Sequence, residues 1–193
     1  MARHKAFDRE EVLDKAMDTF WRKGYEGTSV RDLVENMGIN RGSLYDTFGD
    51  KHALFLAAIA HYEDTVVKNA LACLETPDAD KQTIIEHFYG LIDRAITDGE
   101  KRGCFVTNSA VELCARDCEA AARIENNLKR IERAYGNALK RSQDKGEISK
   151  DLDIHALARS FVCTLQGLRV ITKVNCDRAV LEDIAKVALS ALQ

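Results

Sequence analysis

Apolar residues recur three and four positions apart along almost the whole chain, and this spacing predicts helices and almost no strand. The first predicted helix covers about residues 8–23, where Val12, Ala16 and Phe20 share one face and Gly24 follows. Further helices are predicted at about residues 28–37, 40–48, 51–75, 84–96, 105–115, 117–145, 153–173 and 177–189. We therefore expect an all-α fold.

The two short helices within residues 28–48 are separated by Gly38. Thr28 is expected to cap the first of them with its hydroxyl, and Asn40 to cap the second. Glycine directly after a helix adopts the left-handed conformation without a Cβ clash, so Gly38 is expected to form the turn. The second helix has only Leu44 and Phe48 as an apolar stripe, which leaves its opposite face polar and uncovered. This is the plan of a helix-turn-helix, whose second helix enters the major groove of DNA.

The uncovered face combines slim residues with a long cation. Gly42 and Ser43 would let the helix enter a groove about 12 Å wide, and the Arg41 guanidinium would reach a guanine edge. Tyr45 is expected to bond a phosphate, and Lys51, after a cap at Asp50, to add a cation and backbone N–H groups on the same strand. The residues expected to contact DNA are Thr28, Ser29, Asn40, Arg41, Gly42, Ser43, Tyr45, Thr47 and Lys51.

The same stretch carries a family pattern of glycines, a threonine, a leucine-tyrosine-x-x-phenylalanine run, a lysine and a leucine. It is matched by Gly27, Thr28, Gly38, Gly42, Leu44, Tyr45, Phe48, Lys51 and Leu54. On these positions residues 8–62 resemble the TetR-type transcriptional regulators, with two departures: Val34 replaces the usual alanine, and Asp46 a usually uncharged residue. The resemblance implies an N-terminal three-helix helix-turn-helix domain and a larger C-terminal helical ligand-binding and dimerisation domain. It also implies a homodimer that binds a double-stranded DNA operator and responds to a small-molecule effector.

Charge does not single out the N-terminal segment, since residues 1–61 carry nine Lys or Arg against ten Asp or Glu. DNA binding must therefore depend on where the cations lie. We expect Arg3, His4 and Lys5 to form a flexible arm, with Arg41 and Lys51 at the groove. Because few phosphates would be contacted per subunit, a modest dependence of binding on salt is expected.

The boundary between domains is expected at the cluster of residues 75–80, which contains the only proline, Pro77. Residues 1–52 would form the helix-turn-helix domain, residues 53–75 a linking fourth helix, and residues 76–193 the effector-binding and dimerisation domain. Hydrophobic residues make up 46% and charged residues 31% of the 193 residues, without a run long enough to span a membrane or serve as a secretion signal. On these grounds a cytoplasmic protein is expected. The six cysteines are expected to be reduced, because they show no regular spacing.

The last two predicted helices are apolar on more than one face and carry small residues, among them Ala158, Gly167, Ala185 and Ala188. A pair of this kind favours a homodimer through a four-helix interface. Two-fold symmetry would then place two recognition helices on an inverted-repeat operator. The alternative is that the pair only completes the core of its own subunit.

Cys104, Cys114 and Cys118 lie within one short stretch that Lys101 and Arg102 precede. Nearby cations and a helix N-terminus favour the thiolate, so Cys104 is a candidate sensor of electrophiles or oxidants; the alternative is a buried structural cysteine. The glycine-cysteine-aliphatic segment also resembles one that borders the effector cavity in TetR-type regulators. The residues expected to line that cavity are Phe88, Ile92, Cys104, Phe105, Asn108, Tyr135, Phe161 and Gln166.

Catalytic and cofactor sites are not expected, because the sequence lacks the usual nucleotide-binding, nucleophile and zinc-protease motifs. A metal site is not expected either, since His61 and His87 are single residues and the cysteines form no paired motif. The preferred interpretation is a ligand-responsive repressor. Binding of an effector would favour a conformer whose recognition helices are too far apart for successive grooves, through the helix after Asp50. The remaining alternative is a helical interaction module that binds no DNA.

Overall fold

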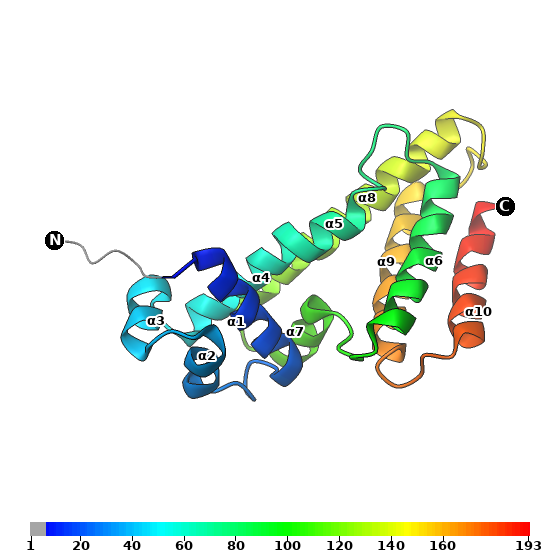
Figure 1. Cartoon of the computed structure of the whole chain (residues 1–193). Coiled ribbons are helices and arrows are strands. Elements are labelled where there is room, and N and C mark those ends of the chain that lie inside the picture. The colour runs from blue at the N-terminus through cyan, green and yellow to red at the C-terminus, as the bar shows by residue number, and fades with distance from the viewer. Residues whose placement is uncertain (1–6) are drawn as a thin grey trace. The chain divides into compact units, whose positions relative to one another are not determined.

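The computed structural model describes residues 7–193, without the side chain of Asp98, and every regular element in this part of the chain is helical (Figure 1). The expected all-α fold is confirmed. The α-helices are α1 (Arg9–Lys23), α2 (Val30–Met37), α3 (Arg41–Phe48), α4 (Lys51–Tyr62), α5 (Lys68–Leu71), α6 (Lys81–Asp98), α7 (Phe105–Leu113), α8 (Cys118–Asp144), α9 (Ile154–Ile171) and α10 (Arg178–Leu189). The arm expected at Arg3, His4 and Lys5 lies outside the described residues.

The chain forms two compact units. The first unit contains the described residues up to Val67 together with Asn108–Ile124, and the second contains Lys68–Thr107 and Glu125–Gln193. Helices α7 and α8 each have residues in both units. The sequence placed one boundary near Pro77, whereas the first unit in the structure also takes in a segment from far along the chain. Helical periodicity reports on local structure, and such a long-range association leaves no trace in it.

The first unit is held together by α1, which packs against α2 and α4. Phe20 of α1 meets Phe55 of α4 edge to face, with ring centroids 5.2 Å apart, and both side chains are buried. Leu33 of α2 and Leu44 of α3 are also fully buried. Burial of aromatic and leucine side chains of this size contributes about 1.5–3 kcal/mol each, which fixes the short helices on a common core.

The cap of α2 differs from the sequence prediction. Ser29, and not Thr28, is the capping residue: its Oγ accepts the Asp32 N–H at 3.1 Å, while the Asp32 carboxylate accepts the Ser29 N–H at 2.8 Å. Thr28 is buried, and its hydroxyl donates to the carbonyl of Gly24 at 2.6 Å. Both residues are good capping types, so the sequence alone placed the cap one residue early.

The other turn predictions within this motif are confirmed. Gly38 has the left-handed conformation (φ 70°), and its N–H donates to the carbonyl of Val34. Asn40 caps α3 by accepting the Ser43 N–H at 2.8 Å, and Asp50 caps α4 by accepting the Ala53 N–H at 2.7 Å. After α4 the chain continues as a π-helical turn over Glu63–Val67, which the sequence pattern did not predict. A single inserted residue changes the register of a helix with little change in its apolar spacing.

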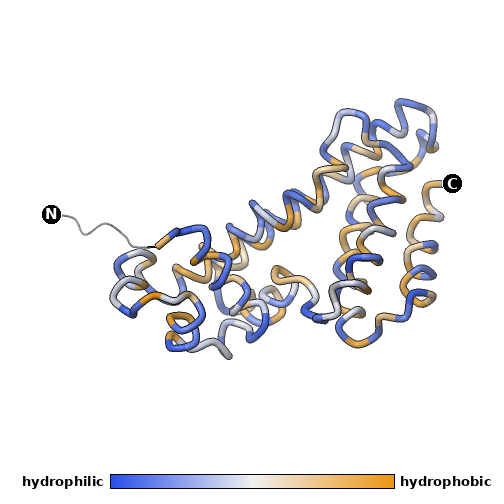
Figure 2. The backbone as a smooth tube through the Cα atoms, in the orientation of Figure 1, coloured by the Kyte–Doolittle hydropathy of each residue, from blue (hydrophilic) through white to orange (hydrophobic). Residues whose placement is uncertain are grey.

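In the second unit, α10 packs against both α6 and α9, and α6 against α9, as an array of neighbouring helices (Figure 1). Hydrophobic and hydrophilic positions alternate around each of these helices (Figure 2). Phe88 of α6, Tyr135 of α8 and Phe161 of α9 are fully buried, and their ring centroids lie 5.3–5.9 Å apart. This aromatic cluster forms the centre of the second unit's core.

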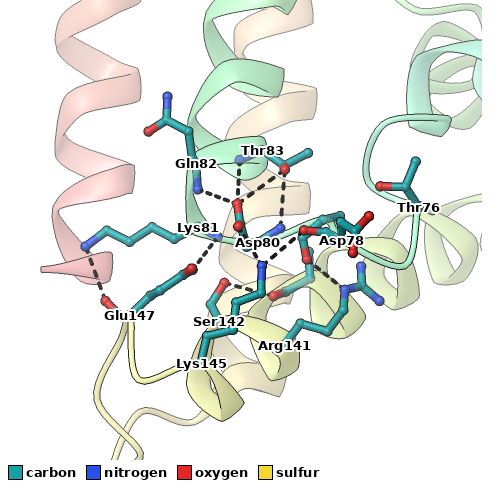
Figure 3. A network of polar contacts seen from close by, with 12 residues as sticks. Thr76, Asp78, Asp80, Lys81, Gln82, Thr83, Arg141, Ser142, Lys145 and Glu147 are labelled. Atoms are coloured by element: carbon teal, nitrogen blue, oxygen red, sulfur yellow. Dashed lines mark hydrogen bonds and ion pairs between the residues drawn. The ribbon is translucent and has the colours of Figure 1, made fainter.

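A polar network fixes the start of α6 against the end of α8 (Figure 3). Asp80 caps α6 and pairs with the Lys145 ammonium at 2.8 Å, while the Arg141 guanidinium donates to the carbonyl of Ala79 at 2.7 Å. The hydrogen bond from Lys145, together with the backbone N–H of Thr83, lowers the pKa of Asp80 below its ordinary value. The loop around Pro77 is thus fixed to the end of α8 by the Arg141 and Lys145 side chains, which donate to its backbone carbonyls.

Candidate functional site

Helix α3 presents a polar face to solvent. Its two apolar residues, Leu44 and Phe48, point into the core of the first unit and are 0% and 9% exposed. The opposite side carries Arg41, Gly42 and Tyr45, and all three are exposed. Because nothing in the first unit's core requires these residues on that side, the arrangement matches a helix that inserts into a groove.

Most residues predicted to contact DNA are accessible. Ser29, Asn40, Arg41, Gly42 and Tyr45 are exposed, whereas Ser43, Thr47 and Lys51 are partly exposed. Thr28 is the exception, since its side chain is buried and its hydroxyl is hydrogen-bonded within the first unit. The Asn40 side-chain oxygen accepts the Ser43 N–H in the helix cap, so it is the side-chain NH₂ of Asn40 that can donate to DNA.

Aromatic rings position two of the cations. The Arg41 guanidinium lies 5.9 Å from the centroid of the Tyr45 ring, so these two side chains lie together on the exposed face of α3. The Lys51 ammonium lies 4.2 Å from the centroid of the Tyr25 ring, which holds it at the start of α4. A rigid ring beside a flexible cation reduces the entropy lost when the cation binds a phosphate or a base.

Salt bridges distinguish Arg41 from Lys23 and Arg31 of the neighbouring helices. Arg31 pairs with Glu35 at 2.7 Å, and Lys23 pairs with Asp32, which caps the same helix. The Lys23 ammonium and the Ser29 hydroxyl lower the pKa of Asp32 far below its ordinary value. Arg41 makes no salt bridge with any residue that the structure describes. Arg41 and Lys51, which also makes no salt bridge among the described residues, are therefore the cations of the motif that are ready to pair with DNA.

The residues predicted to line an effector cavity fall into separate groups. Phe88, Tyr135 and Phe161 pack on each other in the aromatic cluster, and Ile92 and Phe105 are also buried. In the same unit, a guanidinium nitrogen of Arg169 lies 3.3 Å from the Cys104 sulfur, and the Thr107 hydroxyl donates to Gln166 at 2.5 Å. Asn108 belongs to the first unit.

His87, which the sequence does not favour as a metal ligand, is a buried titratable group. It is 5% exposed, and its Nδ1 lies 2.7 Å from the Tyr135 hydroxyl. Burial, reinforced by the charges of Arg94 and Arg169, lowers the pKa of His87 from 6.5 to about 4. Burial also raises the pKa of Tyr135 above its ordinary value, so both partners stay neutral near pH 7.

The lowered pKa of His87 predicts a loss of stability in mild acid. The fold favours the neutral imidazole, so the stabilisation is complete above the unfolded pKa of 6.5 and is lost as the pH falls toward 4. We expect the free energy of unfolding to fall by about 3 kcal/mol more in the wild type than in H87Q over this interval. Urea unfolding at pH 7 and pH 4 measures the difference, and parallel losses in the two proteins would contradict the assignment.

Metal ligands do not gather in the described residues: no group of three or more His, Cys, Asp or Glu lies close enough there to hold an ion. The six cysteines are free thiols, of which Cys104 is buried and Cys73, Cys118 and Cys163 are exposed. No helix in the described part of the chain combines the length and the apolar character that a membrane span requires.

Comparisons with known proteins match the N-terminal and the C-terminal parts of the chain to related family models. Residues 12–58 match the family model described as bacterial regulatory proteins, tetR family, and residues 82–188 match the model described as tetracyclin repressor-like, C-terminal domain. YezE of Bacillus subtilis (strain 168), an uncharacterized HTH-type transcriptional regulator, is 39% identical over 194 residues and 100% of both chains. ComR of Escherichia coli (strain K12), an HTH-type transcriptional repressor, is 31% identical over 99% of this chain and 90% of its own.

A solved structure of a TetR family regulator is similar to this chain along its whole length. It is that of the TetR family transcriptional regulator CifR, a cysteine mutant complexed with 26 bp of double-strand operator DNA. The two proteins are 30% identical and superpose with a TM-score of 0.87 over 100% of each chain. The similarity therefore covers the helix-turn-helix and the C-terminal helices alike.

Proposed function

The chain belongs to the TetR family of bacterial regulatory proteins and is a DNA-binding transcriptional regulator, and we propose that it represses transcription as a homodimer on an inverted-repeat operator. The observation that carries the proposal is the exposed face of α3, where Arg41 has no carboxylate partner among the described residues. ComR is named a repressor, and the related CifR structure contains operator DNA, which supports the same role here.

Each exposed residue of the motif has a role in this proposal. Arg41 reads a guanine edge in the major groove, and Gly42 and Ser43 keep the helix slim enough to enter. Tyr45 and Lys51 bind phosphates and fix the register of the helix. Ser29, Asn40 and Thr47 add contacts at the margins, while Thr28, whose side chain is buried, contributes through its hydrogen bond to Gly24.

The outer face of α9 and α10 supports the homodimer. An open groove on this face is lined by Leu157, Ser160, Thr164, Asp183, Ile184, Val187, Ala188 and Ala191. Val187 of this groove is 74% exposed, and a contiguous exposed apolar patch of this kind is typical of an interface. A second copy related by two-fold symmetry would bury the face against itself in a four-helix interface. Sedimentation of the wild type as a monomer at micromolar concentration would contradict this part of the proposal.

An effector would act by preferring one of two conformers. We propose that its site lies within the second unit, beside the aromatic cluster, among Ile92, Cys104, Phe105 and Gln166, which combine apolar walls with a few polar groups. The effector must bind more tightly to the conformer that does not fit the operator than to the one that does. Only such a difference in effector affinity between the two conformers shifts their equilibrium. A regulator of chromosomal DNA would work in the cytoplasm.

The test of the function is a gel shift with the promoter beside the protein's own gene. We expect retention of this duplex in the presence of excess unrelated competitor DNA. Equal retention of the promoter and of unrelated DNA would leave only non-specific binding and would contradict the proposal.

A second candidate is a thiol sensor on the same scaffold, and the 3.3 Å contact between Arg169 and the Cys104 sulfur favours it. A guanidinium stabilises the thiolate, which adds to an activated alkene by forming a carbon–sulfur bond while the carbanion takes a proton from water. We expect N-ethylmaleimide to lower the operator affinity of the wild type at least about tenfold.

The control for this prediction is C104S, which keeps the exposed Cys73, Cys118 and Cys163. It should retain operator affinity after the same treatment. Equal losses in both proteins would assign the effect to the remaining thiols and would exclude Cys104 as the sensor. Protein mass, measured by mass spectrometry, verifies how many thiols have reacted.

A further inference from the structure

The side chain of Glu112, near the end of α7, binds the turn between α1 and α2. One carboxylate oxygen accepts the Tyr25 N–H at 2.9 Å, and the other accepts the Glu26 N–H at 2.8 Å. All three residues lie in the first unit. Two consecutive backbone donors that point at one carboxylate form charge-assisted hydrogen bonds, which are stronger than neutral ones.

The chain is shaped to receive this carboxylate. Gly24 has φ 74°, and a Cβ at this position would lie 2.8 Å from a Glu112 oxygen. Any other residue there would be strained and would push the carboxylate away. The left-handed glycine thus both turns the chain after α1 and leaves room for Glu112.

The bound turn is connected to the rest of the first unit. The Tyr25 ring meets Phe55 of α4 with centroids 5.0 Å apart, and the Lys51 ammonium lies over the same ring. The Thr28 hydroxyl donates to the Gly24 carbonyl, and Thr28 directly precedes Ser29, the capping residue of α2. A displacement of the turn would therefore reach α4 and the start of the helix-turn-helix.

Two neighbouring contacts reinforce the attachment. His52 of α4 lies 2.7 Å from the carboxylate of Asp117, directly before α8. Arg116 and Glu26 approach to 3.8 Å, but both are exposed, and an exposed pair of this kind contributes little. Residues 112–117 thus hold the α1–α2 turn and α4 together, with Glu112 making the two direct bonds to the backbone.

The other end of α7 is fixed by the second unit's own contacts. Arg169 contacts Cys104, which precedes the helix, and Gln166 accepts the Thr107 hydroxyl. Thr107 and Glu112 belong to one continuous helix and lie about 7–8 Å apart along its axis. We propose that Glu112 is the positioning residue through which α7 sets the α1–α2 turn, and with it α2 and α3. This inference rests on the proposed function, because it supplies the path from effector to DNA.

The first test uses E112Q in the full-length protein without DNA. The glutamine oxygen accepts one N–H, but its amide group faces the second N–H as another donor. We expect amide hydrogen exchange at Tyr25 and Glu26 to accelerate at least about tenfold, while the Leu33 amide in α2 exchanges as in the wild type. E119Q is the matched control, since Glu119 is exposed on α8 in the same unit and should leave both amides unchanged.

The second test measures coupling with the promoter duplex as the probe. Because coupling is reciprocal, DNA binding should slow amide exchange within α7 several-fold in the wild type and E119Q, and much less in E112Q. An equal slowing in all three proteins, or unchanged Tyr25 and Glu26 exchange in E112Q, would overturn the role of Glu112.

If E112Q does not fold, E112D, which keeps the charge on a shorter side chain, should show the same acceleration of exchange at Tyr25 and Glu26. A wild type that fails to bind the duplex would overturn the proposed function, while exchange in the free protein would still decide the role of Glu112.

Discussion

Replacing Arg41 by alanine is expected to weaken specific operator binding by about 5- to 150-fold, the equivalent of the roughly 1–3 kcal/mol that a bidentate contact to guanine contributes. The side chain is exposed, stands over the Tyr45 ring and has no salt-bridge partner among the described residues. Nothing in the fold depends on its charge, so the free energy of unfolding should stay within about 0.5 kcal/mol of the wild type. Fluorescence anisotropy with a labelled promoter duplex measures the affinity.

The matched control is R133A, which removes an exposed arginine from α8 in the second unit. It lowers the net charge by the same amount and should leave the affinity nearly unchanged. If both variants bind equally well, or lose affinity equally, Arg41 reads no base and the assigned face of α3 is wrong. A loss for R41A that is equal on specific and unrelated DNA would instead mark a phosphate contact.

Phe161→Ala is expected to lower the free energy of unfolding by about 3–5 kcal/mol. The ring is fully buried and lies edge-on to Phe88, with centroids 5.3 Å apart, and 5.6 Å from the ring of Tyr135. Removing it would leave a cavity in the centre of the second unit that its rigid neighbours cannot fill. Urea unfolding at a fixed protein concentration measures the loss, because dimerisation makes stability depend on concentration.

V174A is the control for this prediction, since Val174 is 84% exposed in the single chain. It should change the free energy of unfolding by less than about 0.5 kcal/mol. A loss of less than about 1 kcal/mol in F161A would contradict close packing of the aromatic cluster. In that case the ring would border open space, as expected of an effector cavity.

The order of the helices and the helix-turn-helix could be predicted because local rules determine them. Apolar spacing located α1, α6, α8, α9 and α10, and capping side chains at Asn40 and Asp50 placed the starts of α3 and α4. The placement failed at Thr28 because two adjacent residues, Thr28 and Ser29, both suit a cap. Local patterns also missed the π-helical turn, which adds a residue without disturbing the amphipathic pattern.

Long-range contacts could not be predicted from these patterns. Tyr25 and Glu112 are separated by 87 positions, and a glutamate on a short helix looks like any solvated carboxylate in the sequence. A glycine at position 24 was interpreted only as the end of α1, although it also makes room for that carboxylate. The aromatic residues of α6, α8 and α9 were recognised as a group, but whether they pack or line a cavity depends on ångström-scale distances that sequence spacing does not encode.

The charge of the N-terminal segment also gains its meaning only in the structure. Its balance is slightly acidic by sequence, which does not favour DNA binding. In the folded unit, carboxylates engage cations away from α3, as Asp32 does with Lys23 and Glu35 does with Arg31. Arg41 remains available to DNA. The positions of the charges, more than the net charge of the segment, therefore decide whether it can bind DNA.

The central claim is that two copies of α3, held by one homodimer, enter successive major grooves of a duplex. Selection of bound sequences from a random double-stranded DNA library tests it most directly. The account predicts enrichment of an inverted repeat whose half-sites lie about one helical turn, or a multiple of it, apart, and loss of that enrichment in R41A. Enrichment of a single asymmetric site or a direct repeat, or no enrichment at all, would contradict it.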